Sequence, residues 1–209
     1  MGPYGVTARD HPHARPLGKA PLEQAEVSVV HRDMRGGTRR DDSGSGSVSA
    51  RLHVLSCPPA MCPHVEFAVA AVLETPVSLT WTAQPALPGL LQAVLEVAAA
   101  PGTAGALATR LRRLGPVRFE VVEGPAPGVD AERYSGDPDL GLHRAALAAN
   151  GDVVVSEGQL RSLLAAAAGE ATVLVHGLER LLGTAWDGAL EPLRVGGEGA
   201  PVSWLRRTG

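Results

Sequence analysis

The chain has 209 residues, 44% of them hydrophobic, and a formal net charge of −3. This composition fits a soluble globular protein, and the small negative charge gives no electrostatic reason to expect a nucleic-acid partner. No apolar run approaches the roughly 18 residues of a membrane span, and two cysteines are too few for a disulfide framework. We therefore expect a cytoplasmic protein with neither a membrane nor a nucleic-acid partner.

Residues 1–48 differ in composition from the rest of the chain. They are rich in Gly, Pro, Arg, Asp and Ser, and they end in the run Asp41-Asp42-Ser43-Gly44-Ser45-Gly46-Ser47. Such a segment carries too little apolar surface to offset the entropy of ordering its backbone. We expect a disordered N-terminal tail, or a translation start assigned too far upstream, before a folded body that begins near Arg51.

Residues 51–124 predict four strands and two helices. Alternating apolar and polar residues mark the strands, and apolar stripes with helical spacing mark the helices. In chain order the elements are a strand near 52–54, a helix at 62–74, a strand at 77–82, a strand at 91–97, a helix at 104–114 and a strand at 117–122. This is the order of a ferredoxin-like, split βαβ sheet in an α/β fold of the α+β kind. We expect the strand order 4-1-3-2.

The two faces of this sheet differ in polarity. Both helices should cover the face that holds the apolar residues Leu52, Val54, Leu79, Trp81 and Phe119. The other face is polar, and its candidate interface residues are His53, Thr80, Thr82, Gln92, Arg118 and Glu120. Such a face is either solvated or covered by another part of the chain or by a partner.

Residues 129–205 predict a C-terminal β-hairpin and helices that pack on the first unit as one globular body. Asn150-Gly151 is a strong two-residue turn signal within the hairpin. Ser156 and Gln159 form a capping box ahead of an apolar stripe, a further helix ends at Gly183, and a last strand follows at 202–205. We expect this part to dock on the free face of the sheet or to extend one of its edges.

Seven short runs occur together in a specific order and spacing. They are Cys62-Pro63-His64-Val65-Glu66, Trp81-Thr82-Ala83-Gln84-Pro85, Arg118-Phe119-Glu120-Val121, Glu132-Arg133-Tyr134-Ser135, Asn150-Gly151-Asp152, Leu182-Gly183-Thr184-Ala185-Trp186-Asp187 and Leu190-Glu191-Pro192. In this arrangement, residues 51–205 resemble an actinobacterial family, domain of unknown function 3145. The resemblance implies an uncharacterised cytoplasmic protein with no assigned activity. It also implies an association with fatty-acid metabolism, because genes of the family lie near fatty-acid synthesis genes.

The run that begins at Cys62 offers a candidate functional cluster. A thiol at a helix N-terminus can have a lowered pKa, which suits a nucleophile. Residues i and i+4 of a helix share a face while i and i+2 do not, so Glu66 can meet Cys62 and His64 cannot. The simpler interpretation is a small capping thiol, with His64 and Glu66 in structural hydrogen bonds.

Other chemistry is weaker in this sequence. Cys57, Cys62, His64 and His53 could supply zinc ligands, but no second pair of ligands follows downstream, so we expect no metal and no cofactor. The segment 102–105 precedes a helix and could bind an anion, although a simple turn is the plainer interpretation. Tyr134 and Asp137 fall in a predicted loop, where they could line a pocket.

Three functions follow from these observations. We favour a non-enzymatic binding or regulatory protein, because no catalytic constellation is complete in the sequence. The alternatives are a small enzyme that uses Cys62, Glu66 or the Tyr134 loop, and a homo-oligomeric structural subunit whose sheet is its interface. A protein partner or a second copy of the chain is therefore expected.

Overall fold

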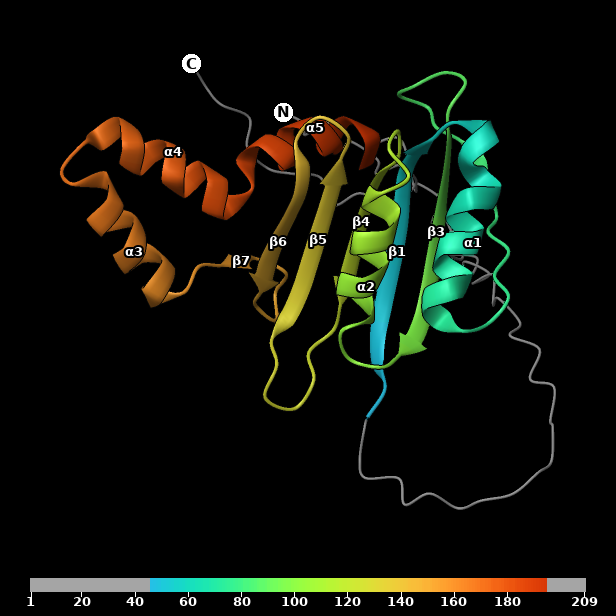
Figure 1. The fold of residues 1–209 in the computed structure, drawn as a ribbon, viewed down its shortest axis with the longest axis horizontal. Coiled ribbons are helices and arrows are strands. Elements are labelled where there is room, and N and C mark those ends of the chain that lie inside the picture. The colour runs from blue at the N-terminus through green and yellow to red at the C-terminus, as the bar shows by residue number, and fades with distance from the viewer. Residues whose placement is uncertain (1–45, 195–209) are drawn as a thin grey trace, which may run out of the picture. The chain divides into compact units, whose positions relative to one another are not determined.

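The computed structural model describes residues 46–194. Within them the fold is mixed α+β, with a seven-stranded antiparallel sheet and five α-helices (Figure 1). The strands are β1 (Val48–Cys57), β2 (Thr82–Ala83), β3 (Leu91–Ala99), β4 (Arg118–Glu123), β5 (Ala131–Asp137), β6 (Gly141–Leu147) and β7 (Val153–Val154). The helices are α1 (Cys62–Leu73), α2 (Thr103–Arg112), α3 (Glu157–Ala167), α4 (Ala171–Leu182) and α5 (Thr184–Arg194). The strands lie in the order β2-β3-β1-β4-β5-β6-β7.

The ends of the chain limit what can be compared with the sequence predictions. The predicted strand at 202–205 and the predicted tail up to residue 45 lie outside the described residues. The boundary at Arg51 is three residues too late, because β1 begins at Val48 and the side chains of Val48 and Ala50 are buried. Both residues pair with β3, so the short alternation Val48-Ser49-Ala50 belongs to the sheet.

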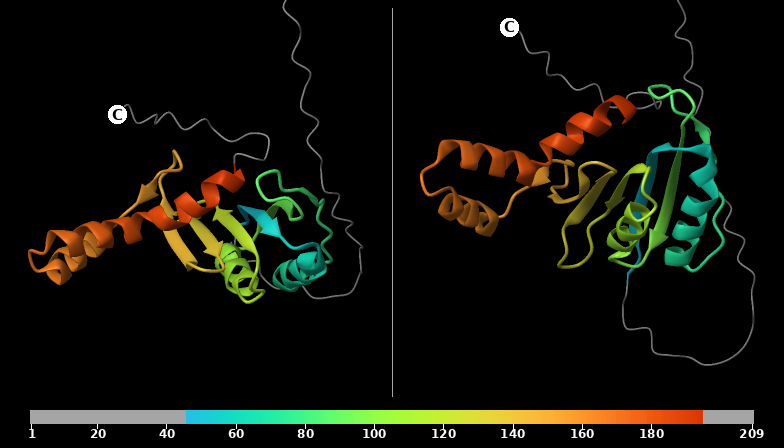
Figure 2. Two further views of the ribbon diagram at one scale, coloured as in Figure 1. Left: turned by 90° about the horizontal axis from the view of Figure 1, so that it is seen from above. Right: turned by 45° about the horizontal axis from the view of Figure 1, so that its top comes forward.

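Helices α1 and α2 cover one face of the sheet, and α5 crosses the opposite face (Figure 2). The larger core lies under α1 and α2 and includes the five apolar residues predicted for that face: Leu52, Val54, Leu79, Trp81 and Phe119. Between Leu52 and Val54, His53 points the other way, because successive side chains of a strand alternate between its faces.

The second predicted strand is much shorter than expected. Of the segment 77–82, only Thr82 belongs to a strand. The carboxylate of Glu66 on α1 accepts hydrogen bonds from the backbone N–H of Leu79 at 2.9 Å and the indole N–H of Trp81 at 3.0 Å. These bonds hold the segment against the helix instead of pairing it along β3. The first four strands keep the predicted order, read from the other end, but the ferredoxin-like assignment is not confirmed and stays a prediction.

The segment around Tyr134 is a strand and not the predicted loop. It is β5, which pairs with β4 and β6, so the C-terminal hairpin extends the edge of the sheet next to β4. The sequence pattern does not indicate this strand, because Glu132 and Gly136 occupy two positions that face the helix-covered core, where a strand pattern would have apolar side chains. A Cβ on Gly136 would lie 2.3 Å from ring atoms of Phe119, so this ring fills the space that a side chain of β5 would take.

A smaller core lies on the opposite face, beneath α5. It joins Leu55 of β1 to Leu190 and Leu193 of α5. The buried amide of Gln84 links the same elements, because it donates to the carbonyls of Leu55 at 2.6 Å and Leu193 at 3.2 Å. α5 continues past Pro192 and ends at Arg194.

The predicted helix signals of the C-terminal part are confirmed. The Ser156 hydroxyl accepts from the backbone N–H of Gln159, whose side chain accepts from the backbone N–H of Ser156. Gly183 ends α4 with a φ of 77°. A Cβ there would lie 2.6 Å from the ring of His143, so glycine is required both for this backbone conformation and for the close approach.

Candidate functional site

Cys62 is buried at the first turn of α1. Its Sγ lies 4.0 Å from Sγ of Cys57 and 3.8 Å from the carbonyl of Pro58, and both cysteines are free thiols. Burial raises the pKa of Cys62, against the expectation that the helix would lower it. Burial and the neighbouring Cys62 raise the pKa of Cys57 to about 12. Two thiols that resist ionisation are poor nucleophiles at neutral pH.

The rest of the predicted cluster does not gather around Cys62. Glu66 binds Leu79 and Trp81, as described above, and His64 is exposed on α1. His53 points to the opposite face of the sheet, so it cannot join a zinc site with the cysteines. Between residues 46 and 194, no group of three or more His, Cys, Asp or Glu side chains is arranged to hold a metal ion.

We expect both thiols to react slowly in the folded protein. At pH 8, iodoacetamide should label Cys57 and Cys62 at least about 10-fold more slowly in native protein than in denaturant, because burial keeps them protonated. Native stability should also fall as the pH rises above the ordinary thiol value of 9.0, since the unfolded chain releases these protons first. Rapid native labelling of Cys62 would contradict this prediction, and a Cys57→Ala variant assigns the label to one thiol.

The start of α2, predicted as a turn or an anion site, is already occupied by a carboxylate of the chain itself. Glu123 at the end of β4 accepts from the backbone N–H of Gly102 at 2.7 Å and of Ala104 at 2.8 Å. The free N–H groups of a helix N-terminus attract an anion, and here Glu123 supplies it. This end of α2 therefore stabilises the fold.

Tyr134 and Asp137 point to opposite faces of β5. The hydroxyl of Tyr134 donates to Glu132 at 2.6 Å, and burial together with Glu132 raises the pKa of Tyr134 to about 12. Burial raises the pKa of Asp137. The N–H groups of the following turn and the guanidinium of Arg118 at 2.8 Å lower this pKa by more than burial raises it, so it lies below its usual value. The two side chains do not line a common pocket.

The residues of the predicted sheet-face interface lie in different environments. Thr80 and Thr82 are exposed, and Gln92 accepts a hydrogen bond from the buried Gln84. His53 is half-buried, and its pKa is lowered first by burial and then by the positive charge of Arg51. These residues therefore do not form one continuous exposed surface.

Glu120 lies buried beneath α5 and holds this helix on the sheet. Arg194 donates to both of its carboxylate oxygens, at 2.6 Å and 2.8 Å. The same guanidinium binds Glu191 at 2.7 Å and Asp187 at 2.9 Å, while Ser135 donates to Glu120 at 3.1 Å. Bidentate arginine–carboxylate pairs are among the strongest hydrogen bonds in proteins, so this network stabilises the position of α5 on the sheet.

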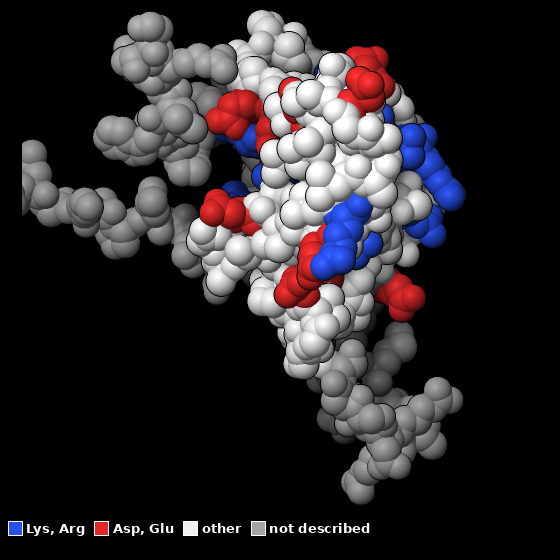
Figure 3. Space-filling view, turned by 90° about the vertical axis from the view of Figure 1, so that its left-hand side faces the viewer, with Lys and Arg blue, Asp and Glu red and all other residues white. Residues whose placement is uncertain are grey.

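A different surface, formed by α3 and α4, is the strongest candidate for a binding site. We call it the hairpin surface, and its large exposed apolar residues are Leu160, Leu164, Val173, Val175 and Leu182. Leu164 is 60% exposed and Val175 is 52% exposed, and no residue of α4 is buried. Figure 3 shows the side of the molecule that α3 and α4 form, and most of it is uncharged. Soluble proteins rarely leave such apolar surface without a function.

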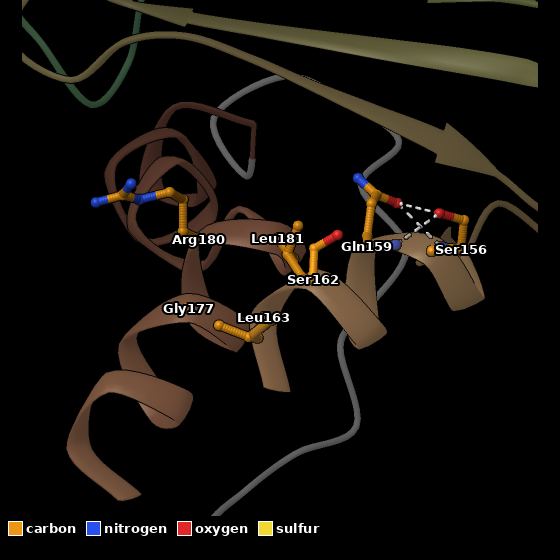
Figure 4. A pocket seen from close by; sticks show the side chains of 8 residues that line it. Ser156, Gln159, Ser162, Leu163, Gly177, Arg180 and Leu181 are labelled. Atoms are coloured by element: carbon orange, nitrogen blue, oxygen red, sulfur yellow. Dashed lines mark hydrogen bonds between the residues drawn. The ribbon is translucent and has the colours of Figure 1, made fainter. Parts of the chain in front are cut away.

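A groove of about 530 Å³ runs between α3 and α4 (Figure 4). Its lining includes Ser156 and Gln159 of the capping box, Leu163, and Arg180. Gly177 also lines the groove, and a Cβ there would be 2.1 Å from Leu163. The Leu163 side chain therefore fills the space beside Gly177, and the two helices approach each other closely at this point.

The charges of the hairpin nearly cancel. Residues 157–182 contain three acidic side chains and two arginines, which gives a net charge of −1 with histidine neutral. Arg161 is engaged in an exposed ion pair with Glu157. The hairpin surface therefore carries almost no net charge.

The comparisons with known proteins give one match. The model of the family described as Protein of unknown function (DUF3145) matches residues 51–207, which is more than half of the chain. The chain belongs to this family. Curated proteins and solved structures gave no match. None of the helices in the described part of the chain has the length and apolar character to cross a membrane.

The DUF3145 match includes every strand from β2 to β7 and all five helices, so the hairpin surface lies within the family region. The sequence analysis did not select this surface, because it expected the C-terminal helices to pack on the first unit. A signal was present: α4 carries apolar residues over most of its circumference, with Thr172, His176, Glu179 and Arg180 confined to one side. Packing against α3 alone does not bury so wide an apolar arc.

Proposed function

We propose that this member of the DUF3145 family is a non-enzymatic binding protein that docks an apolar helical surface of a protein partner on its hairpin surface. The observation that carries the proposal is the exposure of Leu164 and Val175 on helices that are well formed. A helix with an unburied apolar stripe gains stability when a partner covers it. Helices in such complexes pack through anchors spaced at i, i+3, i+4 and i+7.

The hairpin surface is connected to the sheet through α5. α4 meets α5 at Gly183, and α5 is fixed to the sheet by Arg194 and the small core around Leu55. The hairpin is thus presented from a rigid element, which keeps the entropy cost of binding low. A role in regulation follows if the partner is an enzyme. The family resemblance makes enzymes of fatty-acid metabolism the first partners to test.

An enzymatic function has less support. Cys62 is a buried thiol with a raised pKa, Glu66 is engaged in structural hydrogen bonds, and Tyr134 lies on another strand with its hydroxyl bound to Glu132. These groups belong to separate parts of the structure, whereas a nucleophile and its base must lie within hydrogen-bond reach. We therefore place the function at the hairpin surface.

Site-specific photocrosslinking in the native host tests the proposal. A photoreactive amino acid at Leu164 should give adducts with a defined partner, whose crosslinked peptide comes from an apolar helix. The same reagent at Ala106, an exposed residue of α2, should give none. Purified partner should then bind the chain, and Val175→Glu should weaken this binding about 10-fold or more because it places a charge in an apolar interface. Equal adducts at both positions, or unchanged affinity of the variant, would contradict the proposal.

A further inference from the structure

One face of α4 carries an apolar seam, separate from the Gly177 position that meets Leu163 of α3. It consists of Ala171, Val175, Leu178 and Leu182, with spacings of four, three and four residues. Ala171, Val175 and Leu182 are exposed, and Leu178 is half-buried. This spacing is the 3.5-residue repeat of helices that pack knobs-into-holes along a shared seam.

A second apolar seam on α4 faces α3. Leu174, Gly177 and Leu181 lie on this side, and the missing side chain of Gly177 admits Leu163 of α3. The α3–α4 pair therefore forms one layer of two helices, with Leu160 and Leu164 of α3 left exposed. A layer of two antiparallel helices with an outward apolar seam is half of a four-helix bundle.

We infer that a second copy of this chain occupies the hairpin surface, with the seam of α4 packed antiparallel against the same seam of its copy. This inference rests on the proposed function, that the hairpin is a docking surface. A two-fold interface brings identical patches together, and a seam with heptad spacing fits its own copy when the two helices run antiparallel. The antiparallel arrangement also sets opposite ends of the two helix dipoles side by side, which is favourable.

The charge and the size of the hairpin both fit a second copy of the chain. A net charge of −1 on residues 157–182 neither repels an identical hairpin strongly nor selects a partner of opposite charge. The two helices have 11 and 12 residues, and only part of them faces outward, so the interface is smaller than the standard one of roughly 20–30 residues on each side. Two such hairpins form a bundle with short helices, which suits a dimer that depends on concentration.

The test is the mass of the full chain in solution, by size-exclusion chromatography with light scattering at several concentrations. The chain has a mass of 21.6 kDa, so we expect about 43 kDa at high concentration. Val175→Glu with Leu182→Glu should raise the dissociation constant about 100-fold or more, because each charge enters the interface twice. Thr172→Glu, on the polar side of α4, should leave the dimer intact. Circular dichroism confirms that each variant is folded.

A cysteine crosslink gives a second measurement that does not depend on destabilising the protein. Leu178→Cys, near the expected two-fold axis, should form an intermolecular disulfide under mild oxidation, and His176→Cys on the polar side should not. A monomer whose hairpin still crosslinks to another protein would overturn the second copy and leave the proposed function standing. A monomer with no hairpin adduct would overturn both. A dimer unaffected by the seam substitutions would place the interface elsewhere and also overturn the inference.

Discussion

Replacing Arg194 with methionine should lower the free energy of unfolding by about 3 kcal/mol, because it leaves the carboxylate of Glu120 buried without its partner. The side chain of Glu120 is 11% exposed and that of Arg194 is 20% exposed, so water can compensate only part of the lost pair. Methionine retains much of the apolar stem of arginine, so the change removes mainly the charge. Chemical denaturation at pH 7 measures the effect.

Two further variants isolate the cause of this loss. Glu120→Leu combined with Arg194→Met should recover most of the stability, because no unpaired charge remains buried at the pair. Arg161→Met removes an arginine from an exposed ion pair on α3 and should cost only about 0.3–0.5 kcal/mol. A loss at Arg194 no larger than that at Arg161 would show that the network beneath α5 contributes little.

Elements fixed by short-range patterns could be predicted from the sequence. The capping box of Ser156 and Gln159 and the helix stop at Gly183 depend on neighbours within a few residues. A turn does lie at Asn150-Gly151, but three residues separate the bonded Ala148 and Asp152, so the predicted two-residue turn is wrong. The two faces of β1 follow from the alternation of its own side chains. Such features are local because each is satisfied by the backbone next to it.

Elements fixed by distant contacts could not be predicted in this way. Thirteen and fifteen residues separate Glu66 from the groups that it binds in the segment 77–81, so its carboxylate competes with strand pairing in a manner that no alternation reveals. The position of α5 depends on an ion pair between Arg194 and Glu120, which are 74 residues apart. Side chains that bridge such distances override local propensity.

The candidate site shows the same limit. The sequence grouped Cys62, His64 and Tyr134 by their chemistry, but the fold separates them. It also predicted the apolar stripe of α3. A stripe does not state whether its own chain or another chain buries it, and only the exposure of Leu164 and Val175 in the folded protein points to another chain.

Gly136→Ala should lower the free energy of unfolding by about 3 kcal/mol, because the new methyl group overlaps a fully buried ring. Its Cβ would lie 2.3 Å from Cε1 and Cζ of Phe119. Phe119 is fully buried, so its ring cannot move out into solvent to make room. Gly136 is buried in β5 between two paired strands, so its backbone cannot move aside without disturbing β4 and β6. The melting temperature should fall by roughly 6–12 °C for a domain of this size.

A glycine with free space around it provides the matched control. Gly188 lies inside α5, and no atom lies within 4 Å of the position that a methyl group would take there. Gly188→Ala should therefore raise stability by about 0.5–1 kcal/mol through helix propensity. A double-mutant cycle then tests the contact itself. Phe119→Leu should cost less in the Gly136→Ala background than alone, because the smaller side chain makes room for the methyl group. Additive effects of the two substitutions would mean that the ring of Phe119 is not what requires glycine at position 136.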